Sequence, residues 1–462
     1  MPVFLEKNIL YINSPFLLII LILLIALICF VLVMLYYRFI HFGKRVRFPL
    51  PPPGKEGRPG QEYWEGQMLE LAESHSQVRL TSYSYVLDDY NQVAYKRLNK
   101  IRDSISALST DIISLIPAAR WLFDNFQMMY REIKKVRTSG NSYAVLPILK
   151  AKEHRGFPRI YVMAKRMVTL SGGHLTKENI SIMLKAYQQK IPLTDKEIWV
   201  LPEMLGFCLL EEIIMVSDKI LQMIDVKTKA YQFVHEMDGR KRGPGRHGRS
   251  RRQEQQGLYS DYSDLSALLK ELPRELEQNY SFHAHVVYLL RNRSFPEAAI
   301  QKYIEYHFPG KGRQLKASGI FLEEGRIESL LETNIRTLIV SLRDISEVDE
   351  EKFFEEYSCL ERILSQDPDG IYPKMDSEAR GMYRGVIVKL SLRYQISEEK
   401  IASDCLELAT QGREDLHCPH HVGTYLLGKG YPVLKAKALG KSMPKRIKTR
   451  KNIKGYAYFT VL

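Results

Sequence analysis

The chain has 462 residues, of which 45% are hydrophobic, and its formal net charge is +14. That hydrophobic fraction excludes a wholly disordered protein, and the length is enough for two or three domains with packed cores. Five cysteines are scattered without the paired spacing of a disulfide framework or a zinc ribbon, so we expect reduced thiols.

The positive charge is concentrated in two runs. The run at 240–252 has seven basic residues, the run at 435–454 has nine, and neither has an acidic residue. These sixteen charges exceed the net charge of the whole chain, so the remainder is close to neutral. Proteins that bind nucleic acid spread basic residues over a folded face, among aromatic and polar groups that read the bases. We therefore expect no nucleic-acid partner.

The N-terminal part predicts a membrane anchor. Residues 16–37 contain no charged side chain, and 22 residues of helix are long enough to cross a hydrocarbon core of about 30 Å. No cleavage motif follows, so a signal peptide is not expected. Four basic residues come directly after the apolar run, at 38–47. By the positive-inside rule they predict a single-pass protein with its N-terminus outside and its bulk in the cytoplasm.

The remaining chain divides into segments of different composition. The predicted fold class is all-α, with one N-terminal transmembrane helix and two cytoplasmic helical-bundle regions joined by a disordered basic linker. The linker is either a solvated spacer or a segment attracted to anionic membrane lipid. The predicted segments are a short outer N-terminus at 1–14, the transmembrane helix at 15–37, a Pro/Gly-rich basic spacer at 38–62, helical region 1 at 63–237, the linker at 238–262, helical region 2 at 263–434, and a basic tail at 435–462 that leads to a truncated apolar segment.

Three helical stretches are predicted in detail. Thr194 and Glu197 have the spacing of a capping box, so a helix begins there, and Pro202 must bend that helix or divide it into two. The stretch 349–364 opens with acidic residues, where a helix dipole favours them. In 329–345, one broad apolar face predicts a packing helix; its members are Leu330, Ile335, Leu338, Ile339 and Leu342.

The stretch 116–133 mixes aromatic and charged residues, and it has two interpretations. Pro117 suits the first turn of a helix, and apolar residues recur on one face of it, which favours packing. Asp124 and Arg131 lie off that face, so the alternative is a ligand-facing carboxylate at Asp124. The apolar positions are Leu122, Phe126, Met129, Tyr130 and Ile133.

Three short motifs resemble chemical sites. The spacing G-x4-G-K at 423–429 matches a phosphate loop, but Gly430 follows where a magnesium-binding Ser or Thr is needed. The run HCPHH at 417–421 has metal-ligand residue types, but adjacent ligands around a proline cannot all converge on one ion. The DPD at 367–369 resembles an Asp-x-Asp metal–nucleotide motif, but it lies in a Pro/Gly turn. We predict no catalytic, cofactor-binding or metal-binding residue.

Several blocks of the sequence, in order, resemble the N-terminal cytoplasmic region of bacterial cyclic β-1,2-glucan synthases. They are IPAARWLFDNFQMMYREI from 116, FPRIYVMAKRMV from 157, LTDKEIWVLPEML from 193, the segment 340–384, and HVGTYLLGKG from 421. The basic run at 240–252 and the pair at 381–382 depart from the family pattern. The family-motif positions within the blocks are Trp121, Asp124, Asn125, Phe126, Pro158, Arg159, Tyr161, Trp199, Pro202, Asp367, Pro368, Gly370, Tyr372, Met375, Asp376, Tyr383, Arg384, His421 and Gly423.

That resemblance implies a non-catalytic front end of a synthase, present as a truncated, split or stand-alone chain. The family's transferase domain, which uses UDP-glucose and a divalent metal, is absent here, so we expect no cofactor in this chain. The implied partners are membrane lipid, the catalytic remainder of a synthase in the same or a separate chain, and β-1,2-glucan. The implied location is the bacterial inner membrane. The alternative is a membrane-tethered helical interaction scaffold unrelated to glucan synthesis.

Overall fold

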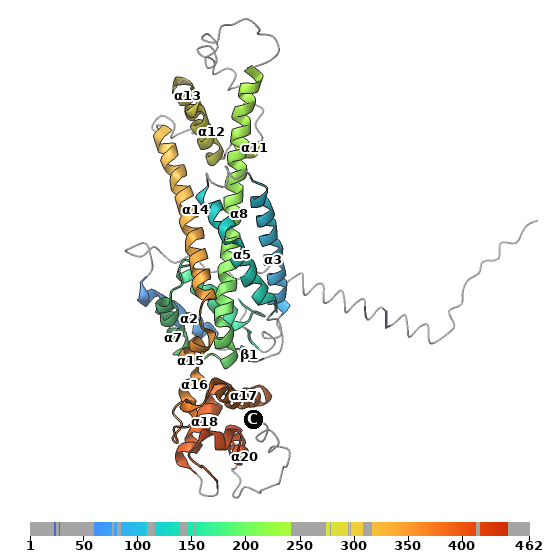
Figure 1. Ribbon diagram of the computed structural model, residues 1–462, viewed down its shortest axis with the longest axis vertical. Coiled ribbons are helices and arrows are strands. Elements are labelled where there is room, and N and C mark those ends of the chain that lie inside the picture. Colours follow the sequence, from blue (N-terminus) through green and yellow to red (C-terminus); the bar gives the residue numbers. More distant parts are fainter. Residues whose placement is uncertain are drawn as a thin grey trace, which may run out of the picture.

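Helix α8 (Asp195–Lys241) is the axis of an elongated helical structure, shown in Figure 1 as a computed structural model. Its 47 residues, at about 1.5 Å each, make a rod roughly 70 Å long. The structure describes residues 23, 24, 27, 60–75, 78–80, 85–108, 116–138, 146–150, 154–241, 274–277, 279–293, 295, 297–307, 317–412 and 416–441.

The other helices of the bundle pack along this rod. Three long helices contact α8 over its length: α3 (Tyr85–Ser106), α5 (Pro117–Thr138) and α14 (Ala317–Ser346). Helices α2 (Gln61–Ser74), α6 (Arg159–Leu170) and α7 (Lys177–Gln188) lie near its N-terminal end, which we call the foot. At the opposite end lie α11 (Arg274–Glu277), α12 (Tyr280–Asn292) and α13 (Glu297–His307).

A smaller group of helices lies below the foot in Figure 1. It follows α15 (Glu350–Tyr357), which contacts α8. We call the group from α16 to α20 the C-terminal unit. Its elements are α16 (Cys359–Leu364), the 3-10 helix η2 (Tyr372–Lys374), α17 (Ser377–Tyr394), α18 (Glu398–Gln411), α19 (Val422–Leu426) and α20 (Tyr431–Ala438).

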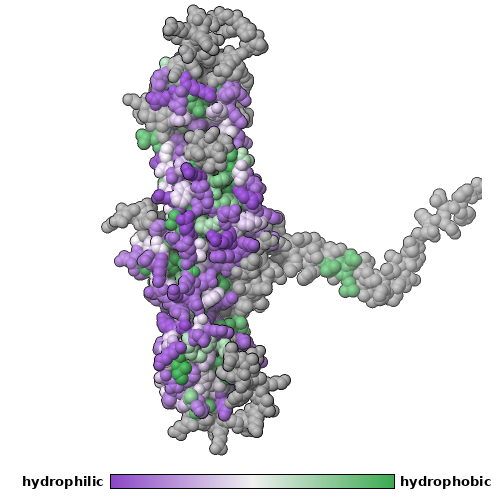
Figure 2. Space-filling view, viewed as in Figure 1, coloured by the Kyte–Doolittle hydropathy of each residue, from purple (hydrophilic) through white to green (hydrophobic). Residues whose placement is uncertain are grey.

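The described residues bury three apolar clusters. The first fills the bundle around the foot and the middle of α8, the second joins the far end of α8 to α12 and α13, and the third lies within the C-terminal unit. Helices α12 and α14, which follow residue 262 in the sequence, pack on α8. The visible face is mostly hydrophilic, with apolar residues in scattered spots (Figure 2).

The fold is mostly helical, which confirms the predicted all-α class, and the described residues add one short pair of strands. Strands β1 (Val78–Leu80) and β2 (Pro147–Leu149) pair in an antiparallel two-stranded sheet. Leu146 and Leu149 are buried, at 1% exposure each. Their segment therefore needs partners for its backbone groups, and pairing with β1 supplies them.

The detailed helix predictions are largely confirmed. The backbone N–H of Glu197 donates to Thr194 Oγ1 at 3.3 Å and the N–H of Thr194 to Glu197 Oε2 at 2.9 Å, as a capping box requires. Helix α8 runs through Pro202 as one element, so the two-helix alternative is wrong. The predicted face of α14 is buried except at Leu330, which is 48% exposed. The stretch 349–364 is two helices, because Ser358 begins a new one by capping α16.

The prediction of a membrane anchor needs a correction. The segments 1–14, 15–37 and 38–62 lie outside the described residues, apart from three helical leucines at 23, 24 and 27 and the positions 60–62. Within the part of the chain that the structure describes, no helix combines the length and apolar character needed to cross a bilayer. This finding overturns the predicted location as a single-pass inner-membrane protein. The linker beyond Lys241 and the tail beyond Lys441 also lie outside the described residues.

A pair of neighbouring glycines gives a test of how α6 packs against α14. Gly172 and Gly173 both have positive φ, at 60° and 79°. A Cβ on Gly173 would lie 2.5 Å from Leu338 Cδ2, whereas one on Gly172 meets nothing within 4 Å. We expect Gly172→Ala to lower the free energy of unfolding by about 1 kcal/mol through backbone strain, and Gly173→Ala by about 1–3 kcal/mol more through overpacking. Urea denaturation measures both.

The excess cost should disappear when the contacted side chain is shortened. In a Leu338→Ala background, Gly173→Ala and Gly172→Ala should cost the same. Equal costs in the wild-type background would contradict the close approach of Gly173 to α14.

Candidate functional site

The first block of motif positions belongs to the packing of the bundle. On α5, Leu122, Met129 and Ile133 are fully buried at 0% exposure. Asp124 lies on the exposed side, where Arg120 Nε is 3.6 Å from its carboxylate. Asn125 accepts a hydrogen bond of 2.8 Å from Arg343 on α14. These contacts join two helices and leave Asp124 at the surface, outside any described cavity.

The second acidic motif, DPD, holds a turn together through its first aspartate. Asp367 has a side chain with 0% exposure that accepts the backbone N–H groups of Ile371, Tyr372 and Val422 at 3.2, 3.1 and 2.9 Å. Nδ1 of His421 lies 2.8 Å from Oδ2 of the same carboxylate. With its oxygens occupied in this way, Asp367 joins the turn after α16 to the start of α19.

His421 connects this turn to α17. Nδ1 of His421 faces Asp367, and the hydroxyl of Tyr383 lies 3.1 Å from Nε2 on the other side of the ring. A Cβ on Gly423 would lie 2.4 Å from that hydroxyl and 2.5 Å from Nε2. Glycine at 423 is therefore what allows the Tyr383–His421 contact. The family-motif positions Asp367, Tyr383, His421 and Gly423 form one structural cluster.

The remaining motif residues in this region do not converge on a ligand. Nδ1 of His417 faces Cys418 Sγ at 2.9 Å, while Nδ1 of His420 donates to the carbonyl of Ala409 at 3.0 Å. The three histidines of HCPHH thus have different partners. Among the described residues no three His, Cys, Asp or Glu side chains are grouped as metal ligands. The G-x4-G-K spacing begins in helix α19, and a Cβ on Gly430 would lie 2.7 Å from the Tyr425 ring, so this glycine serves close packing.

A network of charged residues joins the C-terminal unit to the foot of α8, and we call it the junction network. Its centre is Arg384 on α17, whose guanidinium lies 3.2 Å from Asp195 Oδ2 and donates to Glu361 Oε2 at 2.6 Å. The guanidinium also lies 4.6 Å from the ring centroid of Phe354. Glu361 is 4% exposed and accepts from Tyr372 Oη at 3.0 Å. One arginine therefore connects α8, α15 and α16 to α17.

A second ion pair joins α6 to the first turn of α8. Arg159 and Glu197 are 3% and 0% exposed, and Nε donates to Oε1 at 2.8 Å. Burial alone would lower the pKa of Arg159, but the charge and hydrogen bond of Glu197 hold it above its ordinary value. Nη2 also donates to the Pro192 carbonyl at 3.3 Å. The pair fixes α6 against the loop that leads into α8.

Two carboxyl groups at the junction have raised pKa values. Glu398, at the start of α18, accepts the backbone N–H of Asp195 at 2.8 Å, and burial raises the pKa of Glu398 to about 8. Burial also raises the pKa of Asp195 to about 6, although Ser358 donates to it at 2.8 Å and Arg384 is adjacent. At neutral pH the Glu398 carboxyl is thus largely protonated, and it can both accept and donate a hydrogen bond.

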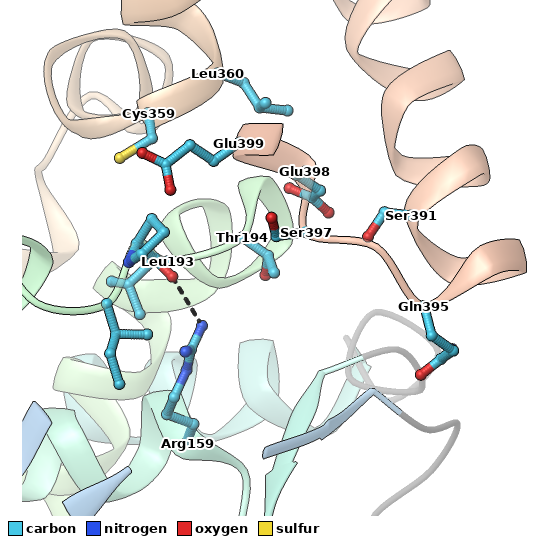
Figure 3. Close-up of a pocket in the computed structure, with 12 residues that line it drawn as sticks. Arg159, Leu193, Thr194, Cys359, Leu360, Ser391, Gln395, Ser397, Glu398 and Glu399 are labelled. Atoms are coloured by element: carbon cyan, nitrogen blue, oxygen red, sulfur yellow. Dashed lines mark hydrogen bonds between the residues drawn. The ribbon is translucent and has the colours of Figure 1, made fainter. Parts of the chain in front are cut away.

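A cavity of about 320 Å³ lies beside this network (Figure 3). Its floor is Arg159 and the loop through Leu193 and Thr194, and the α17–α18 segment closes it from the other side with Ser391 and Glu398. The volume is at the lower end of that of small-molecule sites. The lining residues are Arg159, Ile191, Pro192, Leu193, Thr194, Cys359, Leu360, Ser391, Gln395, Ser397, Glu398 and Glu399.

The structure brings together only part of the predicted set. Arg159, Tyr372 and Arg384 are close to the junction, and Trp199 stacks edge-on against Phe354 with ring centroids 5.5 Å apart. The α5 positions and Tyr161, which donates to Glu211, lie elsewhere in the bundle. Sequence reasoning missed the partners Asp195, Ser358, Glu361 and Glu398. Each of the four lies in the first turn of a helix or caps it, where a dipole or capping role already accounted for it.

The chain is similar to a cyclic beta-(1,2)-glucan synthase. The relative is the protein named NdvB from Rhizobium meliloti (strain 1021), and the two are 26% identical over 324 residues. The matched part is 68% of this chain and 10% of that protein, so the chain spans about a tenth of the length of the relative. No protein-family model matches the chain. The similarity relates the chain to a protein of glucan synthesis.

The junction network predicts a large cost for changing Arg384. In Arg384→Lys, one ammonium cannot reach both Asp195 and Glu361 or stack on Phe354, although Glu361 keeps its ion pair with Arg380. We expect the free energy of unfolding to fall by about 1–3 kcal/mol in urea denaturation. The matched control is Arg393→Lys on the exposed side of α17, which should change it by less than about 0.5 kcal/mol. A loss of similar size in both variants would contradict the role of Arg384.

The raised pKa of Glu398 predicts a pH dependence of stability. Between the ordinary value of 4.5 and about 8, the folded state holds a proton that the unfolded state has released, so stability falls as the pH rises. We expect Glu398→Gln to remove this decline, which is at most about 1.4 kcal/mol per pH unit, because the amide still accepts from Asp195. Urea midpoints measured from pH 4.5 to 8 test it. Glu399→Gln is the control, and an unchanged slope in Glu398→Gln would refute the assignment.

Proposed function

We propose that this chain is a non-catalytic helical part of a machinery that makes cyclic β-1,2-glucan. It supports or regulates glucan synthesis from UDP-glucose by a transferase domain that is not among its own residues. The partner is the catalytic remainder of a glucan synthase, in the same or a separate chain. UDP-glucose and the divalent metal belong to that transferase.

The observation that carries this proposal is the position of the predicted family-motif residues, which lie in the sequence blocks that resemble synthases. Asp367, Arg384 and His421 are engaged with other side chains or backbone groups. Asp367 in particular is enclosed, and its oxygens accept from the protein itself, so DPD does not offer a metal–nucleotide site. Side chains engaged in this way stabilise a surface that a partner could bind, which supports a structural role over a catalytic one.

The proposal has a biochemical and a genetic test. The purified chain, incubated with radiolabelled UDP-glucose and magnesium or manganese, should incorporate no glucose above background. Deletion of its gene should lower the yield of cyclic β-1,2-glucan in the host cell at least severalfold, and the wild-type gene should restore it. Glucose incorporation by the purified chain would overturn the non-catalytic role.

Variants at the junction separate a role in synthesis from a role elsewhere. Arg384→Lys should restore less glucan than wild type, because fewer contacts hold the C-terminal unit to the bundle, whereas Arg393→Lys should restore it fully. If deletion leaves the glucan yield unchanged, the proposed function fails, and a helical interaction scaffold unrelated to glucan synthesis is the better description.

A further inference from the structure

The cavity at the junction is built from polar side chains that are themselves enclosed. Arg159, Ser391 and Glu398 line it and are 3%, 2% and 8% exposed. Enclosed polar groups of this kind fix the orientation of a bound molecule, because their desolvation cost is already met by the fold. Figure 3 shows them on opposite walls, with Arg159 on one side and the α17–α18 segment on the other.

The hydrogen-bonding groups of the cavity are mostly uncharged. Hydroxyls of Thr194, Ser391 and Ser397 and the amide of Gln395 line it. Thr194 and Ser397 each accept one backbone N–H as helix caps and Gln395 Nε2 donates to the Leu392 carbonyl, so a ligand would use their remaining donors and acceptors. Glu398 adds a carboxyl whose pKa is raised to about 8 by burial, so at neutral pH it both donates and accepts. Such a set matches the alternating donors and acceptors of a polyhydroxylated ligand.

The charge of the cavity excludes an anion. Among the twelve described lining residues, Arg159 carries the only positive charge, and that charge is paired with Glu197. Glu399 adds a carboxylate, so a phosphate or diphosphate would meet repulsion and no free cation. Apolar walls at Ile191, Leu193 and Leu360 provide surface for the C–H groups of a ring.

We propose that this cavity binds an uncharged sugar, a terminal unit of a linear β-1,2-glucan chain that has not yet been closed into a ring. The inference rests on the proposed function, which supplies glucan as the sugar. The ligand contacts the foot of α8 and the α17–α18 segment at once, so it binds only when the C-terminal unit is docked. Occupancy thereby couples the presence of glucan to the docked state of the junction.

The test is binding of sophorose, the β-1,2-linked glucose disaccharide, to the full chain by calorimetry at pH 7. Wild type should bind it, and a tenfold excess over Kd should raise Tm by about 1–3 °C. Ser391→Met, which fills the cavity from α17, should weaken binding at least tenfold. Ser391→Ala, which removes one hydroxyl, should weaken it about two- to tenfold. If Ser391→Met does not fold, Ser391→Val fills less of the cavity and replaces it.

Two further measurements separate a sugar from charged ligands. Sophorose affinity should change by less than about threefold between low and high salt, since the ligand carries no charge. UDP-glucose should not compete with sophorose. Absent binding, undiminished binding in folded Ser391→Met, or competition by UDP-glucose would each overturn the assignment. If sophorose does not bind but deletion still lowers the glucan yield, the cavity assignment fails and the proposed function stands. If sophorose binds but deletion leaves the glucan yield unchanged, the proposed function fails and the cavity still binds a sugar.

Discussion

The hydrogen bonds to the first turn of α8 determine how the bundle and the C-terminal unit meet. A helix N-terminus presents unpaired N–H groups and a partial positive charge, and here that end is enclosed between the bundle and the C-terminal unit. Glu197 accepts from Thr194, and Glu398 accepts from Asp195 across 203 residues of sequence. One carboxyl comes from the helix itself and the other from a distant helix, so the same requirement that starts α8 also fixes the C-terminal unit in place.

The buried charged side chains around the first turn of α8 neutralise one another as a group. Arg159 offsets Glu197, and Arg384 offsets Asp195 and Glu361. Buried ion pairs contribute little net stability compared with apolar packing, but removal of one partner is costly, which makes them sensitive determinants of a single arrangement. Both arginines lie in the sequence blocks that resemble glucan synthases. In the structure, both fix how neighbouring helices meet at the start of α8.

Features that depend on residues close together in the sequence could be predicted. Features that depend on residues far apart in the sequence could not. The capping box of α8 and the apolar face around Ile339 depend on spacings within one helix. Leu330 was placed on that face by its spacing, but its neighbour Leu331 packs against the core instead. The junction network was not visible, because Asp195 and Glu398 look like ordinary first-turn acids until the fold brings them together. The return of α14 to α8 across the basic segment was hidden for the same reason.

Because α8 is long, its angle at the foot determines where its other end lies. The helix extends about 70 Å from the junction to the tip where α12 packs, and three long helices brace it on the way. At this length, a rotation of about 5° about the junction would displace the far end of α8 by about 6 Å. A small difference in angle at the foot therefore corresponds to a large displacement beside α12.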